Sequence, residues 1–255
     1  MTPHRIAFSI EEGIARLTLD AADRRNAIDK AFVEAFAHCA KRCDDSRVKV
    51  VLISASGAYF SVGGDLADFV THSEDVENHV RAMADIFHTG IQRLYDSPAP
   101  VVLALRGMAA GGGFSLVCGA DIVIATPSAR LTSAYTRTGL TPDGGLSYFL
   151  ERSVGYRKAF EIMALNPVMD AVEAMRLGIV NQLVEEGALE TATDAIARSI
   201  AGRPGCASLR LKQLMRGGDT TLAARLQREA IAIAKQAATA ESLESVRAFL
   251  SRESR

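Results

Sequence analysis

Apolar and polar residues alternate near the start of the chain. Ile6, Phe8 and Ile10 form one alternating run, residues 15–19 form a second, and Glu12-Gly13 separates them. Successive side chains of a strand point to opposite faces, so this pattern predicts a β-hairpin.

Helical and strand patterns then follow one another. Asp29 can cap a helix whose apolar residues recur every three or four positions over residues 32–40, and the apolar run VKVVLIS follows as a buried strand. A second long helix has the same spacing over residues 76–94 and ends at Ser97-Pro98. The run VVLAL, residues 101–105, is predicted to be the next strand.

The second half of the chain changes from mixed to helical patterning. A glycine-rich turn, an apolar helix from about Gly112 to Cys118 and the strand DIVIA complete an alternation that predicts a largely parallel sheet covered by helices. From roughly residue 144 onward the pattern is almost entirely helical, with Ala-rich faces between Leu222 and Leu250. Since no flexible linker separates the parts, we predict one folding unit whose C-terminal helices pack against partner subunits.

The charge balance limits the partners to be expected. Lys plus Arg number 29 and Asp plus Glu number 30 in the 255 residues, so no long-range field favours nucleic acid or an anionic membrane. The first ten residues lack the apolar core of a signal peptide, and no apolar run approaches the roughly 18 to 20 residues that span a bilayer. We therefore predict a cytoplasmic protein without nucleic-acid or membrane partners.

Two glycine-bearing segments carry most of the functional information. GAYFSVGGDL follows the strand VVLIS and RGMAAGGGFSL follows the strand VVLAL, so both lie at carboxyl ends of strands, where ligands of open α/β sheets bind. If Gly112 opens the next helix, its N–H points outward at the positive end of the helix dipole, and Gly64 can supply a second donor. Either turn alone can be a tight connection only, but together they favour an oxyanion hole.

Other familiar motifs are absent. Neither segment reads G-x-G-x-x-G, no G-x-x-x-x-G-K-[ST] occurs, and Tyr59 stands where a serine-hydrolase elbow around Ser61 needs glycine. The five histidines form no H-E-x-x-H or similar cluster, and the four cysteines contain no C-x-x-C pair. We therefore predict no metal site and reduced, mostly buried thiols.

The chain resembles the crotonase (enoyl-CoA hydratase/isomerase) superfamily over about residues 5 to 250. The resemblance rests on RRNAID, GAYFSVGGDL, GMAAGGGFSLVCGADIVIA and LTSAYTRTGLTPDGGLSYFLERSVG. It implies an α/β fold of the crotonase-type ββα spiral (ClpP/crotonase-like). In this fold, residues 1–195 are the core with the acyl-CoA site, and residues 196–255 are a helical trimerisation region of the same folding unit. It further implies a homotrimer or dimer of trimers, an acyl-CoA thioester as substrate, and no cofactor beyond the coenzyme A of the substrate.

The resemblance also assigns site residues. The family's oxyanion-hole motifs match this chain so that Gly64 and Gly112 carry the two N–H donors. Residues along the family's coenzyme A site correspond here to Arg24, Arg25, Ala27, Val62, Asp65, Leu66 and Gly111. Arginine suits phosphate because its planar guanidinium donates two hydrogen bonds at once. The alternative for the two arginines is a solvated surface loop.

The chain departs from the family's hydratases at both of their catalytic glutamates. The matching positions hold Ser115 and Tyr135, which are not ordinary bases near neutral pH and are expected to line the substrate pocket. One acid remains, Asp143 in GLTPDGG, a context that resembles the ring-1,2-epoxyphenylacetyl-CoA isomerase and enoyl-CoA isomerase type. The alternative for Asp143 is a cap of the following helix.

We therefore expect an acyl-CoA isomerase in which Asp143 moves a proton and Gly64 and Gly112 hold the enolate oxygen. A double-bond shift needs one base, whereas hydration needs a second group that orients water. Two alternatives stay open. One is an enoyl-CoA hydratase or acyl-CoA hydrolase with Ser115 or Tyr135 holding water, and the other is a catalytically inactive acyl-CoA-binding or scaffolding homologue.

Overall fold

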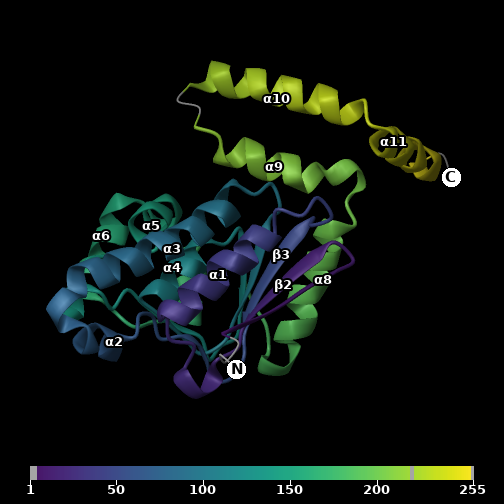
Figure 1. Ribbon diagram of the computed structural model, residues 1–255. Helices are drawn as coiled ribbons and strands as arrows, with labels where there is room; N and C mark the ends of the chain where they lie inside the picture. The colour runs from purple at the N-terminus through teal and green to yellow at the C-terminus, as the bar shows by residue number, and fades with distance from the viewer. Residues whose placement is uncertain (1–4, 219–220, 254–255) are drawn as a thin grey trace.

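The strands form two sheets with helices packed around them (Figure 1). The computed structural model describes residues 5–218 and 221–253. One sheet has six strands in the order β1-β2-β3-β5-β7-β10, and the other has four in the order β4-β6-β8-β9. The strands are β1 (Ile6–Glu11), β2 (Ile14–Leu19), β3 (Val50–Ala55), β4 (Tyr59–Ser61), β5 (Val101–Leu105), β6 (Met108–Ala110), β7 (Ile122–Ala125), β8 (Arg130–Thr132), β9 (Met169–Asp170) and β10 (Gln182–Leu183). The α-helices are α1 (Lys30–Arg42), α2 (Leu66–Thr71), α3 (Val76–Asp96), α4 (Gly112–Gly119), α5 (Leu146–Val154), α6 (Tyr156–Leu165), α7 (Ala171–Arg176), α8 (Leu189–Ala201), α9 (Ala207–Arg216), α10 (Leu222–Ala237) and α11 (Ala240–Glu253).

The N-terminal hairpin is confirmed with its predicted turn. Strands β1 and β2 pair antiparallel from Ile6 opposite Leu19 to Glu11 opposite Ile14. Glu12 and Gly13 between them both have positive φ, 52° and 79°, as a two-residue hairpin turn with the twist of the strands requires. From β2 onward, neighbouring strands of the six-stranded sheet run parallel.

The long strands are apolar throughout because both faces of the larger sheet are covered. In β3, Val51 and Ile53 join the core under α1 and α3, whereas Val50 and Leu52 join a second cluster with Ala197 of α8. Figure 1 shows α1 and α8 on opposite sides of β2 and β3. A strand buried on both faces reads as a continuous apolar run rather than an alternating one, which is why VVLIS and VVLAL lack period two.

The smaller sheet gives the fold its spiral form. The chain runs from β3 to β4, from β5 to β6 and from β7 to β8, so that successive turns add one parallel strand to each sheet. The switch after β5 needs a glycine, because Gly107 has φ +65° and a Cβ there would lie 1.9 Å from the Ala58 carbonyl oxygen. This is the crotonase-type ββα spiral that the resemblance implied, whereas the alternating pattern alone predicted only one sheet.

The predicted helices α1 and α3 form the wall on which the site is built. The Asp29 carboxylate caps α1 by accepting a hydrogen bond of 2.9 Å from the Phe32 N–H, as predicted, and Arg5 pairs with this carboxylate. The two helices pack against each other, with the rings of Phe36 and Phe87 5.4 Å apart. Helix α3 ends at Asp96, directly before the predicted stop.

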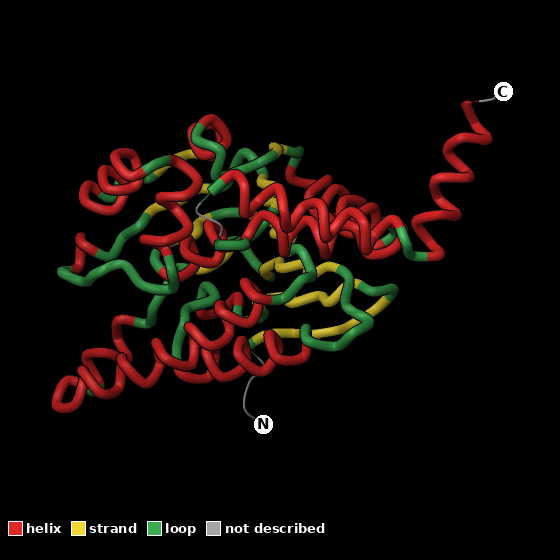
Figure 2. The backbone as a smooth tube through the Cα atoms, turned by 90° about the horizontal axis from the view of Figure 1, so that it is seen from above, coloured by secondary structure: helices red, strands yellow, loops and turns green. Residues whose placement is uncertain are grey.

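The C-terminal helices reach away from the body of the molecule (Figures 1 and 2). Helix α9 is anchored by the buried Lys212, which donates to the carbonyl oxygens of Leu94 and Ala99. Beyond it, α10 and α11 present exposed apolar side chains, among them Leu222, Ile233 and Phe249. The predicted division between residues 195 and 196 falls inside α8. Among the described residues, no helix combines the length and the apolar character needed to cross a membrane.

Candidate active site

The two glycine turns touch each other. Strands β4 and β6 are parallel neighbours, and the turns follow them directly. Gly63 has φ +85°, and a Cβ there would lie 2.8 Å from the Ala110 carbonyl oxygen; a Cβ on Gly111 would lie 3.6 Å from the Gly63 Cα. The prediction of neighbouring strand ends is therefore right, although the strands are the short β4 and β6 of the second sheet rather than β3 and β5.

The backbone leaves two N–H groups free in these turns. On either side of Gly64, the Ile28 N–H donates to the Gly63 carbonyl and the Asp65 N–H donates to the Ile28 carbonyl. The Gly64 N–H itself makes no hydrogen bond to any described residue. Gly112 is the first residue of α4, where N–H groups have no partner within the helix, and within residues 5–218 and 221–253 its N–H also has no acceptor.

Both free N–H groups belong to residues that line one cavity of about 470 Å³. That volume is within the range of small-molecule sites. Apolar side chains make up most of the wall: Ile28, Val33, Val62, Leu66, Phe69, Val80, Met83, Ala84, Phe87 and Leu140. The ionisable side chains of the lining are Glu77, Arg81, Tyr135 and Asp143. An apolar ligand with a single polar carbonyl suits this lining.

The Asp143 carboxylate lines the cavity and pairs with a histidine that was not predicted. Its Oδ1 lies 2.6 Å from Nε2 of His88 on α3, and both side chains are close to half exposed. Helix α5 starts only at Leu146, after Gly145, and has no side-chain cap. The alternative that Asp143 caps this helix is therefore wrong, and its carboxylate remains available to a ligand.

Ser115 and Tyr135 hold the backbone of Asp143. The Ser115 hydroxyl donates to the Asp143 carbonyl oxygen at 2.8 Å, the Tyr135 hydroxyl donates to it at 3.2 Å, and the two hydroxyls are 3.2 Å apart. Burial raises the pKa of Tyr135, so its phenol stays protonated and serves as a donor. Tyr135 lines the cavity as expected, whereas Ser115 is buried and does not.

These contacts place Asp143 beside the two donors. Ser115 lies in the first turn of α4, which Gly112 opens. A ring carbon of Phe87 lies 3.6 Å from the position of a Cβ on Gly112 and 3.0 Å from that of a Cβ on Gly144. Glu77, the other acid of the lining, precedes His88 by eleven residues on α3, about 16 Å along the helix at 1.5 Å per residue. Asp143 is thus the carboxylate near the turns.

The residues matched to a coenzyme A site divide into two groups. Val62, Leu66 and Gly111 line the cavity, and Arg24, Arg25, Ala27 and Asp65 do not. The guanidinium of Arg24 pairs with the Asp65 carboxylate at 2.7 Å, and that of Arg25 lies 5.4 Å from the centre of the Tyr59 ring. The two arginines therefore have protein partners, and their contact with phosphate stays a prediction.

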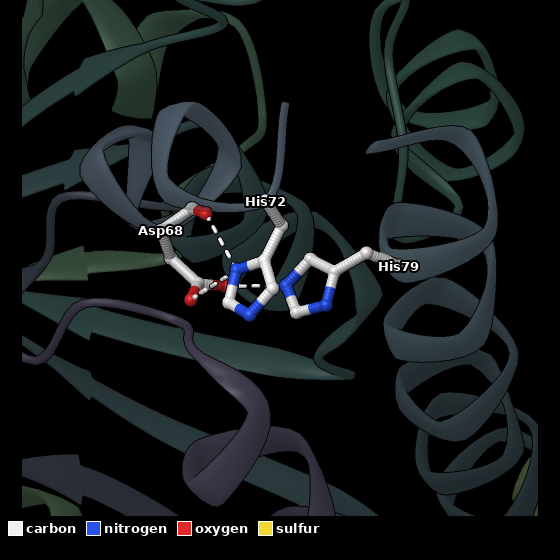
Figure 3. A group of neighbouring side chains, drawn as sticks. All are labelled: Asp68, His72 and His79. Atoms are coloured by element: carbon white, nitrogen blue, oxygen red, sulfur yellow. Dashed lines mark hydrogen bonds and ion pairs between the residues drawn. The ribbon is translucent and has the colours of Figure 1, made fainter. Parts of the chain in front are cut away.

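Sequence reasoning missed two groupings of titratable side chains. His88 and Asp143 are 55 residues apart, and no local pattern marks that pair. Asp68, His72 and His79 also come together, across the break between α2 and α3 (Figure 3). The spacing of Asp68 and His72, four residues on a helix, was the one available signal for the second grouping.

Comparisons with known proteins show which family this chain matches. The family whose sequence model matches residues 9–255 carries the description "Enoyl-CoA hydratase/isomerase". A Rhodobacter capsulatus protein named "Probable enoyl-CoA hydratase" is 32% identical over 251 residues, 98% of this chain and 96% of its own. The 1,2-epoxyphenylacetyl-CoA isomerase of Escherichia coli is 30% identical over 252 residues, with the same coverage of both chains. The crystal structure of an enoyl-CoA hydratase from Polaromonas sp. JS666 matches with a TM-score of 0.90 at 27% identity, over 97% of each chain.

Proposed function

The chain belongs to the enoyl-CoA hydratase/isomerase family, and we propose that within it the protein is an acyl-CoA isomerase with Asp143 as its base. The observation that carries the proposal is one carboxylate beside two free N–H groups in a mainly apolar cavity. The positions of the two hydratase glutamates hold Ser115 and Tyr135, which bind the backbone carbonyl of Asp143 instead. The Escherichia coli relative named as an isomerase supports the same assignment.

The reaction requires one proton to leave and one to return. The thioester carbonyl oxygen accepts hydrogen bonds from the N–H groups of Gly64 and Gly112. The Asp143 carboxylate takes a proton from the carbon next to the carbonyl, and the electron pair of the C–H bond moves toward the thioester oxygen. For a β,γ-unsaturated acyl chain the product is a dienolate, and the Asp143 carboxyl returns the proton to the γ-carbon. Charge develops on the oxygen only during this step, so the two donors lower the barrier.

His88 orients the base in this scheme. Its Nε2 lies 2.6 Å from one oxygen of the Asp143 carboxylate, which leaves the other oxygen for the substrate. Ser115 and Tyr135 fix the backbone of the same residue from the opposite end. A base held by three contacts loses less freedom when substrate binds, which favours proton transfer.

The family supports a proposal for the substrate, and the exposed apolar surface supports one for the oligomeric assembly. We propose an acyl-CoA thioester whose acyl chain enters the cavity and whose nucleotide lies near the loop of Arg24 and Arg25. For the arginines to bind phosphate, Arg24 must exchange its contact with Asp65. The exposed apolar residues of α10 and α11 support a homotrimer or a dimer of trimers, in which these helices are covered.

Hydration is the second candidate, and His88 is the observation that favours it. Addition of water needs a group that activates water and a group that delivers a proton to carbon. Asp143 and His88 together supply two such groups, and the Rhodobacter capsulatus and Polaromonas relatives are named as hydratases.

A direct comparison of two substrates separates the candidates. We expect fast conversion of a β,γ-enoyl-CoA to its conjugated isomer, followed by the ultraviolet absorbance of the conjugated thioester, and slow hydration of crotonyl-CoA. We expect Asp143→Asn to lower isomerisation by roughly 100 to 10,000-fold, the range of general base catalysis. His88→Gln should retain more activity than Asp143→Asn. Hydration faster than isomerisation in the wild type would defeat the isomerase proposal.

A further inference from the structure

Three side chains outside the acid site converge at the break between α2 and α3. Oδ1 of Asp68 lies 3.2 Å from Nδ1 of His72, and its Oδ2 lies 2.6 Å from Nε2 of His79. The two imidazole rings stack with their centres 3.8 Å apart and their planes 7° from parallel. Figure 3 shows the carboxylate of Asp68 facing both rings. One oxygen and two ring nitrogens, one from each residue, all lie within 4.8 Å of one another.

We propose that Asp68, His72 and His79 bind a divalent transition metal ion of the zinc class. Imidazole nitrogen suits Zn²⁺, Co²⁺ and Ni²⁺, whereas Mg²⁺ and Ca²⁺ prefer sites built of oxygen alone. Two imidazoles and one carboxylate form a common three-ligand set for zinc, which leaves a fourth position to water. Glu74, Asp75 and Glu77 lie in the connecting turn and the first turn of α3, and their charges favour a cation there.

The local structure brings the ligands to the same place from two elements. Asp68 lies in α2 and His72 directly follows its last residue, four positions further on, so the two side chains come from the same side of the helix end. His79 comes from the first turn of α3, which follows the short helical turn Ser73–Asp75. The side chain of His79 is 16% exposed and that of Asp68 is 23% exposed, so both are already largely withdrawn from water.

Metal binding requires one of the two stacked imidazole rings to turn, because nearly parallel rings cannot both direct an in-plane lone pair at one ion. Ligand atoms about 2.0 to 2.2 Å from a tetrahedral zinc ion lie roughly 3.3 to 3.6 Å from each other. The Asp68–His72 contact of 3.2 Å is near this separation, and the Asp68–His79 contact of 2.6 Å must widen as the metal replaces the shared proton. Nδ1 of His72 also lies 2.9 Å from the Asp68 carbonyl oxygen. This nitrogen must be unprotonated to bind metal, and because the ring is nearly half exposed its Nε2 can carry the proton in water.

Metal binding would join two walls of the acyl cavity. Leu66 and Phe69 of α2 line the cavity, and so do Val80 and Met83 of α3, just after His79. Helix α2 has only six residues, too few to be stable by itself, and tertiary contacts must hold it in place. A metal that binds Asp68 and His72 on one side and His79 on the other fixes α2 against α3, and thereby the shape of the wall that faces the acyl chain.

Zinc titration of the untagged, full-length protein tests the site. We expect the wild type to bind one Zn²⁺ per chain in isothermal titration calorimetry, and Mg²⁺ to give no heat of binding. His79→Ala should weaken zinc binding at least about 100-fold. Loss of a residue that only hydrogen-bonds to a metal ligand already costs roughly 10 to 100-fold in metal affinity, and His79 is proposed as a ligand itself. Asp68→Asn, which keeps the size of the side chain, should weaken it as well. With Co²⁺ in place of Zn²⁺, the visible absorption band of a nitrogen- and oxygen-bound ion should appear in the wild type only.

Two matched controls distinguish this site from adventitious binding. His38 is exposed on α1 and does not belong to the cluster, and Cys206 is an exposed thiol. His38→Ala and Cys206→Ser should both bind zinc as the wild type does. Equal affinity in the wild type and His79→Ala, no saturable binding in the wild type, or loss of binding in Cys206→Ser would overturn the proposal.

Hydrogen exchange tests directly whether bound metal holds α2 against α3. Zinc should slow amide exchange over residues 66–72 at least tenfold in the wild type and leave it unchanged in Asp68→Asn. Bound zinc without slower exchange in this segment would overturn the joining of α2 to α3. This readout does not depend on turnover, so it is independent of the proposed isomerase activity.

Discussion

Replacement of Gly112 by proline removes one of the two N–H donors from the cavity. Gly112 is the first residue of α4, the helix position at which proline is most readily accepted, and its N–H has no acceptor among the described residues. Gly111 before it has φ 52° and ψ −124°, outside the α region that a following proline disfavours. The variant therefore deletes the donor without breaking a hydrogen bond of the fold.

Gly112→Ala is the matched control. Both substitutions place a Cβ 2.7 Å from the end of the Ile28 side chain and 3.6 Å from the Phe87 ring, so they displace the same neighbours. Ile28 is contacted at its flexible Cδ1, which can move. Alanine retains the N–H, whereas proline puts its ring Cδ where the hydrogen was. The difference between the two variants isolates the donor, together with the bulk of the two further ring carbons, Cγ and Cδ.

The expected difference is that of one oxyanion donor. Loss of such a group typically costs about 2.7 to 4 kcal/mol of transition-state stabilisation, which is roughly 100 to 1000-fold in kcat. The assay is isomerisation of a β,γ-enoyl-CoA at saturating substrate, with circular dichroism and Tm to confirm the fold. A pure steric effect of the proline ring would raise KM and leave kcat near that of Gly112→Ala. A folded Gly112→Pro protein with kcat within a few-fold of Gly112→Ala would refute the oxyanion hole.

Other predictions concern buried titratable groups. Burial lowers the pKa of Lys212 to about 8 from 10.5, so the unfolded chain binds more protons between these values. The free energy of unfolding of the wild type, relative to that of Lys212→Met, should therefore rise between pH 8 and 10.5, by at most about 1.4 kcal/mol per pH unit. Urea titrations of both proteins across this range measure the difference, and a difference that does not change with pH would count against the prediction. Burial raises the pKa of Cys39, and that of Cys43 to about 12, so a thiol reagent should label the exposed Cys206 in the native protein well before either of them, with all reacting after denaturation. Burial also raises the pKa of Tyr135, so Tyr135→Phe should reduce kcat about fivefold, the effect of one hydrogen bond, without shifting the alkaline limb of the pH profile; a shifted limb would show that the phenol titrates.

The parts of the fold predicted well are those specified by local patterning. The β1–β2 hairpin, the Asp29 cap of α1 and the end of α3 before Ser97 depend on neighbours in sequence, and each is confirmed. The glycine turns were recognised because close approach of backbones restricts the residue type, as at Gly63 beside Ala110.

The parts that escaped prediction depend on distant pairing. Strands β4, β6 and β8 have three residues each, too few to establish a period, and only their mutual pairing makes them a sheet. The contact of His88 with Asp143 arises from the packing of α3 against the loop before α5, which no local signal encodes. The helix-cap reading of Asp143 failed because Gly144 and Gly145, both with positive φ, delay the start of α5 by two residues.

Exchange of the α-protons of a CoA thioester in deuterated water tests the central claim most directly. With phenylacetyl-CoA and nuclear magnetic resonance detection, the wild type should incorporate deuterium next to the thioester, and Asp143→Asn should lose roughly 100 to 10,000-fold of that rate. Glu77→Gln, which alters the other acid of the cavity, should exchange at close to the wild-type rate. Unchanged exchange in Asp143→Asn, or its loss in Glu77→Gln instead, would contradict the assignment of Asp143 as the base.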